Sequence, residues 1–278
     1  MSTAHIEVKG VSKVFGGTVL ALQDIHLDIP RGQFVCLLGP SGCGKSTLLN
    51  AIAGFAAPSS GSIVADGRPV AAPGPERGMV FQEYALFPWM TVADNVAFGL
   101  RLKGVPRAQA DATVERLLRT LSLQEFRHRF PKELSGGMRQ RVAIARVLAL
   151  DSPIMLMDEP FGALDALTRR SLQDELLRIW SELHKTIIFV THSIEEALYL
   201  ADRIVVMTYR PGTIKRDLLV GLPRLRDPAA PGFNALKREL DQLVMEEQQR
   251  HQHDELKGDI NGDVPSFPSR RKRGYVPI

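Results

Sequence analysis

A glycine-rich segment that follows an apolar run constrains this chain more than any other part of its sequence. The run at 34–38 has the composition of a buried strand, and the segment after it matches the pattern G-x-x-x-x-G-K-[ST]. Glycines let backbone N–H groups turn toward an anion, and the helix expected at 45–53 adds the positive end of its dipole. The sequence therefore predicts a phosphate-binding loop formed by Gly39, Pro40, Ser41, Gly42, Cys43, Gly44, Lys45, Ser46 and Thr47.

Two side chains of this loop have predicted roles in phosphoryl transfer. Lys45 is expected to reach the β- and γ-phosphates of a nucleotide, and Ser46 to ligate Mg²⁺. The alternative is a glycine-rich turn that happens to contain Lys-Ser, and the flanking strand and helix argue against it. A nucleotide site alone names no function, because many folds and chemistries share this loop.

Further motifs appear in an order that is typical of one family. They are Gln82 after a short apolar stretch at 79–81, Leu134-Ser135-Gly136-Gly137-Met138-Arg139-Gln140-Arg141, Asp158-Glu159-Pro160 after an apolar stretch at 154–157, Ala163-Leu164-Asp165, and Thr191-His192 after a strand at 186–190. Together with the phosphate-binding loop they resemble the ATP-binding cassette (ABC) ATPases, over about residues 5 to 245. The resemblance implies that the chain binds ATP and Mg²⁺ and hydrolyses ATP.

The chemistry and the resemblance together give roles to the polar residues at the strand ends. Asp158 is expected to hold Mg²⁺, and Glu159 to act as the general base that orients the attacking water. The resemblance implies that Gln82 senses the γ-phosphate and Mg²⁺, and that His192 contacts the γ-phosphate. A histidine satisfied at a strand end is the alternative for His192. Phe15 matches the aromatic residue that stacks on adenine in this family, whereas a core position is its alternative.

Ser135, Gly136 and Gly137 form a second turn suited to an anion. A Ser-Gly-Gly turn that opens a helix presents backbone N–H groups and a hydroxyl to a phosphate, although an ordinary helix cap would look the same. The resemblance implies that this turn contacts the γ-phosphate held by another subunit, in a head-to-tail homodimer with two-fold symmetry. It places Asp165 in the loop at the dimer contact.

Composition agrees with a soluble motor subunit. The chain has 278 residues, of which 44% are apolar, and a formal net charge of +4, which predicts a mixed, solvated surface. No apolar run approaches the roughly 18 residues that span a bilayer, and the first residues have no signal-like apolar core. The two cysteines, Cys36 and Cys43, favour a reducing cytosol. Because Cys43 stands near a helix N-terminus and Lys45, it is expected to be a reactive thiolate.

The order of strand and helix patterns predicts an α/β fold. We expect a P-loop NTPase core with a mainly parallel sheet, an N-terminal antiparallel β part and an inserted α-helical subdomain at about 85–150. Ligands then belong at the carboxyl ends of the parallel strands. The expected helices of the insertion span 91–102, 108–121 and 137–150, and the whole ATPase domain spans 1–230.

The C-terminal part of the chain predicts one more helix and a tail. An amphipathic helix is expected within 231–256, packed on the core through Phe233, Leu236, Leu240 and Leu243. Residues 257–278 are rich in Gly, Pro, Asp and Ser and hold Arg270-Arg271-Lys272-Arg273, so a disordered basic tail is expected. Contact of this tail with lipid or a permease is the alternative.

Three longer blocks, at 73–89, 160–169 and 191–198, resemble the ATPase subunits of bacterial nitrate/sulfonate/taurine-type importers. That resemblance implies two integral-membrane permease subunits, an extracytoplasmic solute-binding protein, a small anionic solute, no nucleic acid, and a peripheral place on the cytoplasmic face of the bacterial inner membrane. The aromatic segment at 83–92, beside Gln82, is expected to be partly packed and partly in contact with a permease helix. The alternatives are a soluble ABC ATPase without a transport role and a non-hydrolysing regulatory module.

Overall fold

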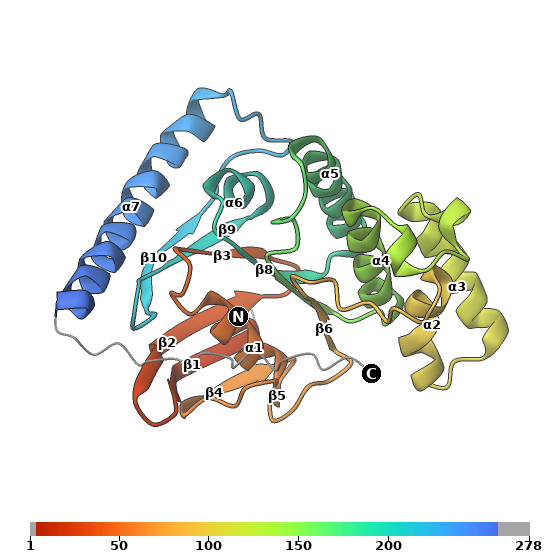
Figure 1. Ribbon diagram of the computed structural model, residues 1–278, viewed down its shortest axis with the longest axis horizontal. Coiled ribbons are helices and arrows are strands. Elements are labelled where there is room, and N and C mark those ends of the chain that lie inside the picture. The colour runs from red at the N-terminus through yellow and green to blue at the C-terminus, as the bar shows by residue number, and fades with distance from the viewer. Residues whose placement is uncertain (1–3, 261–278) are drawn as a thin grey trace, which may run out of the picture.

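The computed structural model describes residues 4–260, which form two sheets, with helices packed around them (Figure 1). The helices are α1 (Lys45–Ala53), α2 (Val92–Leu102), α3 (Arg107–Thr120), α4 (Gly136–Ala149), α5 (Ala166–Leu183), α6 (Ile194–Leu200) and α7 (Pro231–Ile260). The strands are β1 (Ala4–Phe15), β2 (Val19–Pro30), β3 (Phe34–Leu38), β4 (Ser60–Ala65), β5 (Arg68–Pro69), β6 (Arg77–Val80), β7 (Ile154–Asp158), β8 (Thr186–Thr191), β9 (Arg203–Met207) and β10 (Ile214–Leu219). Within these residues no helix is both long and apolar enough to cross a membrane.

A six-stranded sheet in the order β10-β9-β3-β8-β7-β6 forms the centre of the molecule. The strands from β9 to β6 are parallel, and β10 pairs antiparallel with β9 at one edge. The register aligns the last residues of neighbouring strands, since Leu38 pairs with Thr191 and Asp158 pairs with Val190. The loops that carry the predicted phosphate-binding residues therefore leave the sheet along one edge, as parallel topology requires.

The two faces of this sheet are covered differently. Alternate side chains of a strand point to opposite faces, so Val35 and Leu37 pack on one side and Phe34 and Cys36 on the other. The first side holds α1 and the four-stranded antiparallel sheet β2-β1-β4-β5, and the second side holds the remaining helices. Burial on both faces explains why the central strands are continuous apolar runs.

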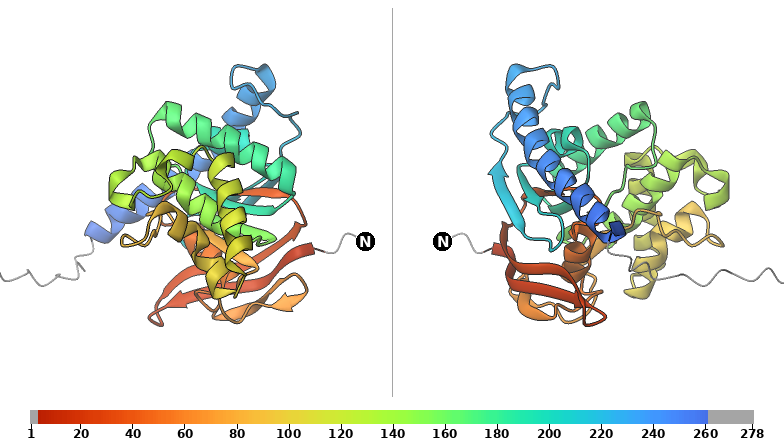
Figure 2. Two further views of the ribbon diagram at one scale, coloured as in Figure 1. Left: turned by 90° about the vertical axis from the view of Figure 1, so that its right-hand side faces the viewer. Right: turned by 60° about the vertical axis from the view of Figure 1, so that its left-hand side comes forward.

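The helical insertion lies at one end of the molecule and α7 at the other (Figures 1 and 2). The three predicted helices of the insertion are confirmed, each within one residue of its expected bounds. Thr91 and Ser135 precede α2 and α4 as N-caps, because each side chain accepts a backbone N–H two to three residues into the helix.

The C-terminal helix is longer than expected. The prediction ended it at 256, whereas α7 continues to Ile260, so the tail expected at 257–278 was wrong for its first residues. Residues 261–278 lie outside the described part of the chain. The predicted packing is confirmed, since Phe233 and Leu240 are fully buried in the core and Leu243 is partly buried against it.

Aromatic rings anchor the segment that follows Glu159 to the central sheet. Phe161 is fully buried, its ring centre lies 5.6 Å from that of Phe189, and Phe189 in turn lies 6.0 Å from Phe34. Such a cluster holds a loop in place. If one of its rings is removed, the folded protein loses both the transfer free energy of that ring and its packing contacts.

We expect Phe161→Ala to lower the free energy of unfolding by about 3–5 kcal/mol, because it leaves a cavity under the Glu159 segment. Phe161→Leu keeps most of the volume and is expected to cost only about 1 kcal/mol. Urea unfolding of both variants measures the difference. Equal losses for Ala and Leu would contradict the packing assigned to this ring.

Candidate nucleotide-binding site

A pocket of about 430 Å³ opens at the carboxyl edge of the central sheet. It brings together residues of the phosphate-binding loop, the end of β1, the start of β2, the segments after β6 and β7, and the turn before β10. The lining residues are Phe15, Val19, Ala21, Ser41, Gly42, Gly44, Lys45, Ser46, Thr47, Gln82, Glu159 and Arg210. Residues from distant parts of the chain, among them Phe15, Gln82 and Glu159, thus reach the same hollow as the loop.

The backbone of the phosphate-binding loop depends on its glycines. Gly44 has φ +97 and stands immediately before α1, and a Cβ built on it would lie 2.7 Å from the Leu22 side chain. Only glycine fits both the conformation and the space. Lys45 is 4% exposed, and its Nζ donates hydrogen bonds to the carbonyls of Gly39 (2.8 Å) and Pro40 (2.9 Å). The ammonium group is therefore held against the backbone of the phosphate-binding loop.

Two oxygen-bearing side chains face each other at the start of α1 and the end of β7. The Ser46 hydroxyl donates a hydrogen bond of 2.8 Å to Oδ1 of Asp158. Burial raises the pKa of Asp158, and the bond from Ser46 opposes that shift. A hydroxyl and a carboxylate supply the hard oxygen ligands that Mg²⁺ prefers beside nucleotide phosphates, so this pair fits the ion.

Glu159 and His192 meet across the ends of β7 and β8. Nδ1 of His192 lies 3.1 Å from Oε2 of Glu159, and the Glu159 N–H donates to the carbonyl of Val190 at 3.0 Å. Glu159 has φ +42, a conformation that costs free energy for a residue other than glycine and that is concentrated at functional sites. Glu159 thus lines the same pocket as the phosphate-binding loop.

Phe15 lies at the rim of the pocket. It is 45% exposed at the end of β1, and the ammonium group of Lys13 lies 5.2 Å from its ring centre. The core position that was the alternative for Phe15 is therefore wrong. Stacking of this ring on adenine stays a prediction that its exposure and place favour.

Comparison with known proteins identifies the family. Residues 22–162 match the family model described as ABC transporter. The chain belongs to the ABC transporter family. The taurine import ATP-binding protein TauB of Roseobacter denitrificans is 54% identical to this cassette over 202 residues, which cover 73% of this chain and 75% of that protein. The nitrate import ATP-binding protein NrtD of Synechocystis is 48% identical over 238 residues, or 84% of this chain and 90% of that protein.

Solved structures give the same fold for this ABC cassette. The dimeric post-hydrolysis state of the ATP-binding cassette MJ0796, bound to ADP and Pi, superposes with a TM-score of 0.69 at 32% sequence identity, covering 78% of this chain and all of that chain. A second dimeric structure of MJ0796 superposes with a TM-score of 0.70 at 33% identity, with the same coverage. The expected P-loop NTPase fold is thereby confirmed.

The Ser-Gly-Gly turn of the ABC cassette does not line the pocket of its own chain. Ser135 is exposed at the N-terminus of α4, and its hydroxyl accepts the N–H of Met138 at 3.3 Å. Asp165, also outside the pocket, accepts the N–H of Thr168 at 3.0 Å at the start of α5, and this bond lowers the pKa of Asp165. Both residues cap helices that point their N-termini to the surface.

The helices behind these two caps are in close contact. A Cβ built on Gly137 would lie 2.5 Å from Cγ2 of Thr168, so a larger residue at 137 would require the Thr168 side chain to shift. Nε of Arg141 lies 3.1 Å from the Glu175 carboxylate, which adds an ion pair between the same helices. The Ser135 turn and the Asp165 loop are thus fixed relative to each other.

The aromatic segment after Gln82 is divided as expected between packed and exposed side chains. The ring centre of Phe87 lies 4.5 Å from that of Phe98 on α2, and the buried Asn95 amide binds both the N–H and the carbonyl of Phe87. Trp89, in contrast, is 70% exposed. Arg146 of α4 donates to the Tyr84 carbonyl at 3.2 Å and ties the segment to the helix that Ser135 caps.

The expected reactivity of Cys43 is wrong. Its thiol is fully buried, and burial raises the pKa of Cys43 more than the nearby Lys45 lowers it. Cys36 is also fully buried, and burial raises the pKa of that thiol well above its usual value. Sequence proximity to Lys45 and a helix N-terminus was a misleading signal, because the Cys43 side chain points under the loop into the apolar layer.

We expect both thiols to resist iodoacetamide in the folded protein at neutral pH, because alkylation needs an exposed thiolate. Unfolding in urea exposes Cys36 and Cys43 and is expected to give rapid labelling of both. Mass spectrometry of the alkylated peptides measures each site. Rapid labelling of Cys43 in the native protein would show that its thiol is accessible and reactive after all.

Arg210, Val19 and Ala21 line the pocket although sequence reasoning did not select them. Val19 and Ala21 are part of an ordinary strand pattern, so nothing distinguishes them. Arg210 lies in the sequence Tyr-Arg-Pro-Gly, which signals a turn between strands and no ligand. Only the fold brings this turn to the phosphate-binding loop.

Proposed function

We propose that this chain is the ATP-hydrolysing subunit of a bacterial importer for a small anionic solute. The observation that carries the proposal is the similarity, over about three quarters or more of the chain, to ATP-binding proteins named for taurine import and nitrate import. The pocket supports it, because a phosphate-binding loop, an oxygen pair for Mg²⁺ and a carboxylate held by histidine lie along one sheet edge.

In this proposal each pocket residue has one task. Lys45 and the loop N–H groups bind the β- and γ-phosphates of ATP, while Ser46 and Asp158 would hold Mg²⁺, which neutralises phosphate charge when bound. Glu159 orients the attacking water and takes its proton, and His192, which lies beside the Glu159 carboxylate, contacts the γ-phosphate and braces the water. Gln82 reaches the γ-phosphate and the metal ion from the segment after β6.

The subunit acts as a homodimer in this proposal. Ser135, Gly136, Gly137 and Asp165 lie outside the pocket of their own chain, which supports a role for them at the contact with a partner. A head-to-tail arrangement with two-fold symmetry gives each ATP one phosphate-binding loop and one Ser-Gly-Gly turn. The dimeric state of the MJ0796 structures agrees with this arrangement.

Two integral-membrane permease subunits complete the proposed assembly. The exposed Trp89 and the segment around it would receive a permease helix, which places the dimer at the cytoplasmic face of the inner membrane. An extracytoplasmic solute-binding protein would deliver the solute to the permeases. Nitrate, taurine, alkanesulfonates, bicarbonate and aromatic acids are all solutes of a suitable class.

Reconstitution with the permease subunits that co-purify with the chain tests the proposal. Proteoliposomes with ATP inside are supplied with a solute-binding protein and with radiolabelled taurine or nitrate outside, and uptake and ATP turnover are measured together. We expect one anionic solute to raise both uptake and ATP turnover. Lys45→Ala is expected to abolish uptake and ATP turnover through loss of ATP binding. An ATPase rate that no permease and no solute changes would favour a soluble ABC ATPase instead.

A further inference from the structure

We infer that Arg210 is a second phosphate-binding cation of the nucleotide site, supplied by the turn between β9 and β10. The inference rests on the proposed ATPase function. Arg210 lines the pocket together with Ser41 and Gly42 of the phosphate-binding loop. Its Nη2 lies 3.9 Å from the position that a Cβ on Gly42 would take, so the guanidinium group borders the loop itself.

The surroundings of Arg210 leave its charge available for a ligand. Within residues 4–260 it forms no ion pair, and its one ring contact is with Tyr209 next to it, 5.8 Å from the ring centre. The other ionisable side chains of the pocket are Lys45 and Glu159. Two cations against one carboxylate, beside the N-terminus of α1, favour a ligand with more than one negative charge.

The backbone that carries Arg210 is fixed to β2 and to the phosphate-binding loop. The Gly212 N–H donates to the carbonyl of Ala21, and its carbonyl accepts from the N–H of Gln23, both at 3.0 Å. A Cβ on Gly212 would lie 2.3 Å from the Cys43 carbonyl, so the turn packs directly on the loop. Inside the turn, the Thr208 hydroxyl donates to the Pro211 carbonyl at 2.8 Å.

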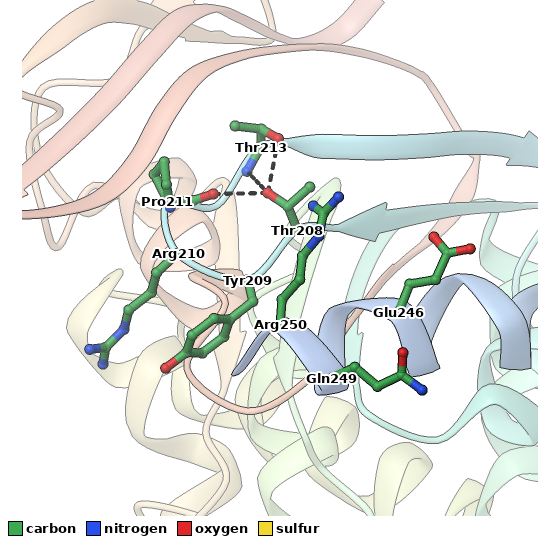
Figure 3. Close-up of a pocket in the computed structure, with 8 residues that line it drawn as sticks. All are labelled: Thr208, Tyr209, Arg210, Pro211, Thr213, Glu246, Gln249 and Arg250. Atoms are coloured by element: carbon green, nitrogen blue, oxygen red, sulfur yellow. Dashed lines mark hydrogen bonds between the residues drawn. The ribbon is translucent and has the colours of Figure 1, made fainter. Parts of the chain in front are cut away.

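The C-terminal helix fixes the other side of the same turn. Glu247 of α7 is fully buried, and its carboxylate accepts the Tyr209 N–H at 2.9 Å and a bond from Lys215 at 2.7 Å. A pocket of about 740 Å³ lies between the turn and α7, and in Figure 3 the Arg210 side chain points away from Glu246 and the other α7 residues that line it. The turn is thus held at its backbone, while the Arg210 guanidinium is directed away from the helix.

Phosphate is the ligand group that this geometry favours. The planar guanidinium fork donates paired hydrogen bonds to phosphate oxygens, and it stays charged at any physiological pH. Phe15 and Val19 supply apolar surface to the same pocket, whereas Arg210 borders Gly42 of the phosphate-binding loop. The structure therefore assigns Arg210 to the phosphates of ATP and ADP, in addition to Lys45.

Nucleotide affinity of the full-length chain tests this assignment. Displacement of a fluorescent ADP analogue gives dissociation constants for ATP, ADP and inorganic pyrophosphate with the parental protein, Arg210→Ala, Arg210→Lys and the control Arg216→Ala. Arg216 is a half-exposed arginine on β10 that does not line the pocket. We expect Arg210→Ala to weaken binding of all three ligands about five- to tenfold, Arg210→Lys to recover part of the loss, and Arg216→Ala to bind as the parent does.

Each contrary result has a distinct meaning. Affinities of Arg210→Ala within twofold of the parent, or a loss matched by Arg216→Ala, would overturn the assignment while leaving the ATPase proposal intact. Weaker ADP binding with unchanged pyrophosphate binding would move the contact to ribose or base and overturn the phosphate assignment. A parental protein that binds neither ATP nor ADP would overturn the proposed function itself.

Discussion

Glu159→Gln is expected to leave ATP binding intact and to lower the hydrolysis rate by about 10²- to 10⁴-fold, the contribution typical of a general base. The amide keeps the size of the side chain and its place 3.1 Å from His192, but it cannot accept the proton of the attacking water. Because ATP then persists, the variant is also expected to accumulate as an ATP-bound dimer. Gel filtration with ATP and a phosphate-release assay measure the two effects.

Glu195→Gln is the matched control for this substitution. Glu195 lies on α6, close in sequence to His192, and its carboxylate pairs with Lys237 at the surface. The control is expected to hydrolyse ATP at the parental rate and to dissociate after turnover. A Glu159→Gln protein that stays monomeric and hydrolyses as fast as the control would show that another group activates the water.

Ser135→Arg is expected to leave ATP binding by its own chain nearly intact and to lower hydrolysis by about two orders of magnitude or more. The exposed turn at the start of α4 lies outside the pocket of its own chain. In the proposed head-to-tail dimer, an arginine there would clash with the γ-phosphate held by the partner. Lys45→Ala damages the other half of the composite site. Each variant alone therefore gives a homodimer with two damaged sites.

Mixing the two variants gives a result that neither homodimer can give. In the heterodimer both lesions fall in one composite site, and the second site is intact. If subunits exchange freely, half of the dimers are mixed and each has one intact site. If one intact site can hydrolyse ATP on its own, about one quarter of the parental ATPase activity is expected to return. If Ser135→Arg instead prevents the isolated chain from binding ATP, that turn serves its own nucleotide and the head-to-tail arrangement is wrong.

The sequence predicted well the site residues at the carboxyl edge of the sheet, because the motifs there directly follow strand patterns. Apolar runs buried on both faces end at the residues that carry chemistry, so Asp158 and His192 could be assigned to strand ends before the structure was known. Parallel pairing then brings those ends together, because β7 and β8 are neighbours in the sheet. The helix bounds were also close, since caps such as Thr91 mark them locally.

Features set by packing between distant segments could not be predicted in this way. Burial of Cys43 depends on the apolar layer between α1 and the N-terminal sheet, so its sequence neighbours gave the wrong sign for its pKa shift. Arg210 reaches the pocket because Gly212 pairs with β2, far away along the chain. The end of α7 was placed too early, because a polar composition does not by itself end a helix.

The close approach of Gly137 to Thr168 has a consequence for communication between the two ATP sites. Displacing the turn capped by Ser135 without the loop that holds Asp165 would break the contact between Gly137 and Thr168 and the ion pair between Arg141 and Glu175. In the proposed dimer, we therefore expect the Ser135 turn, which faces the partner's nucleotide, and the Asp165 loop at the dimer contact to advance and withdraw together. Each subunit would then contact the ATP of its partner either fully or not at all. Such all-or-none contact favours dimer closure in one step over gradual closure.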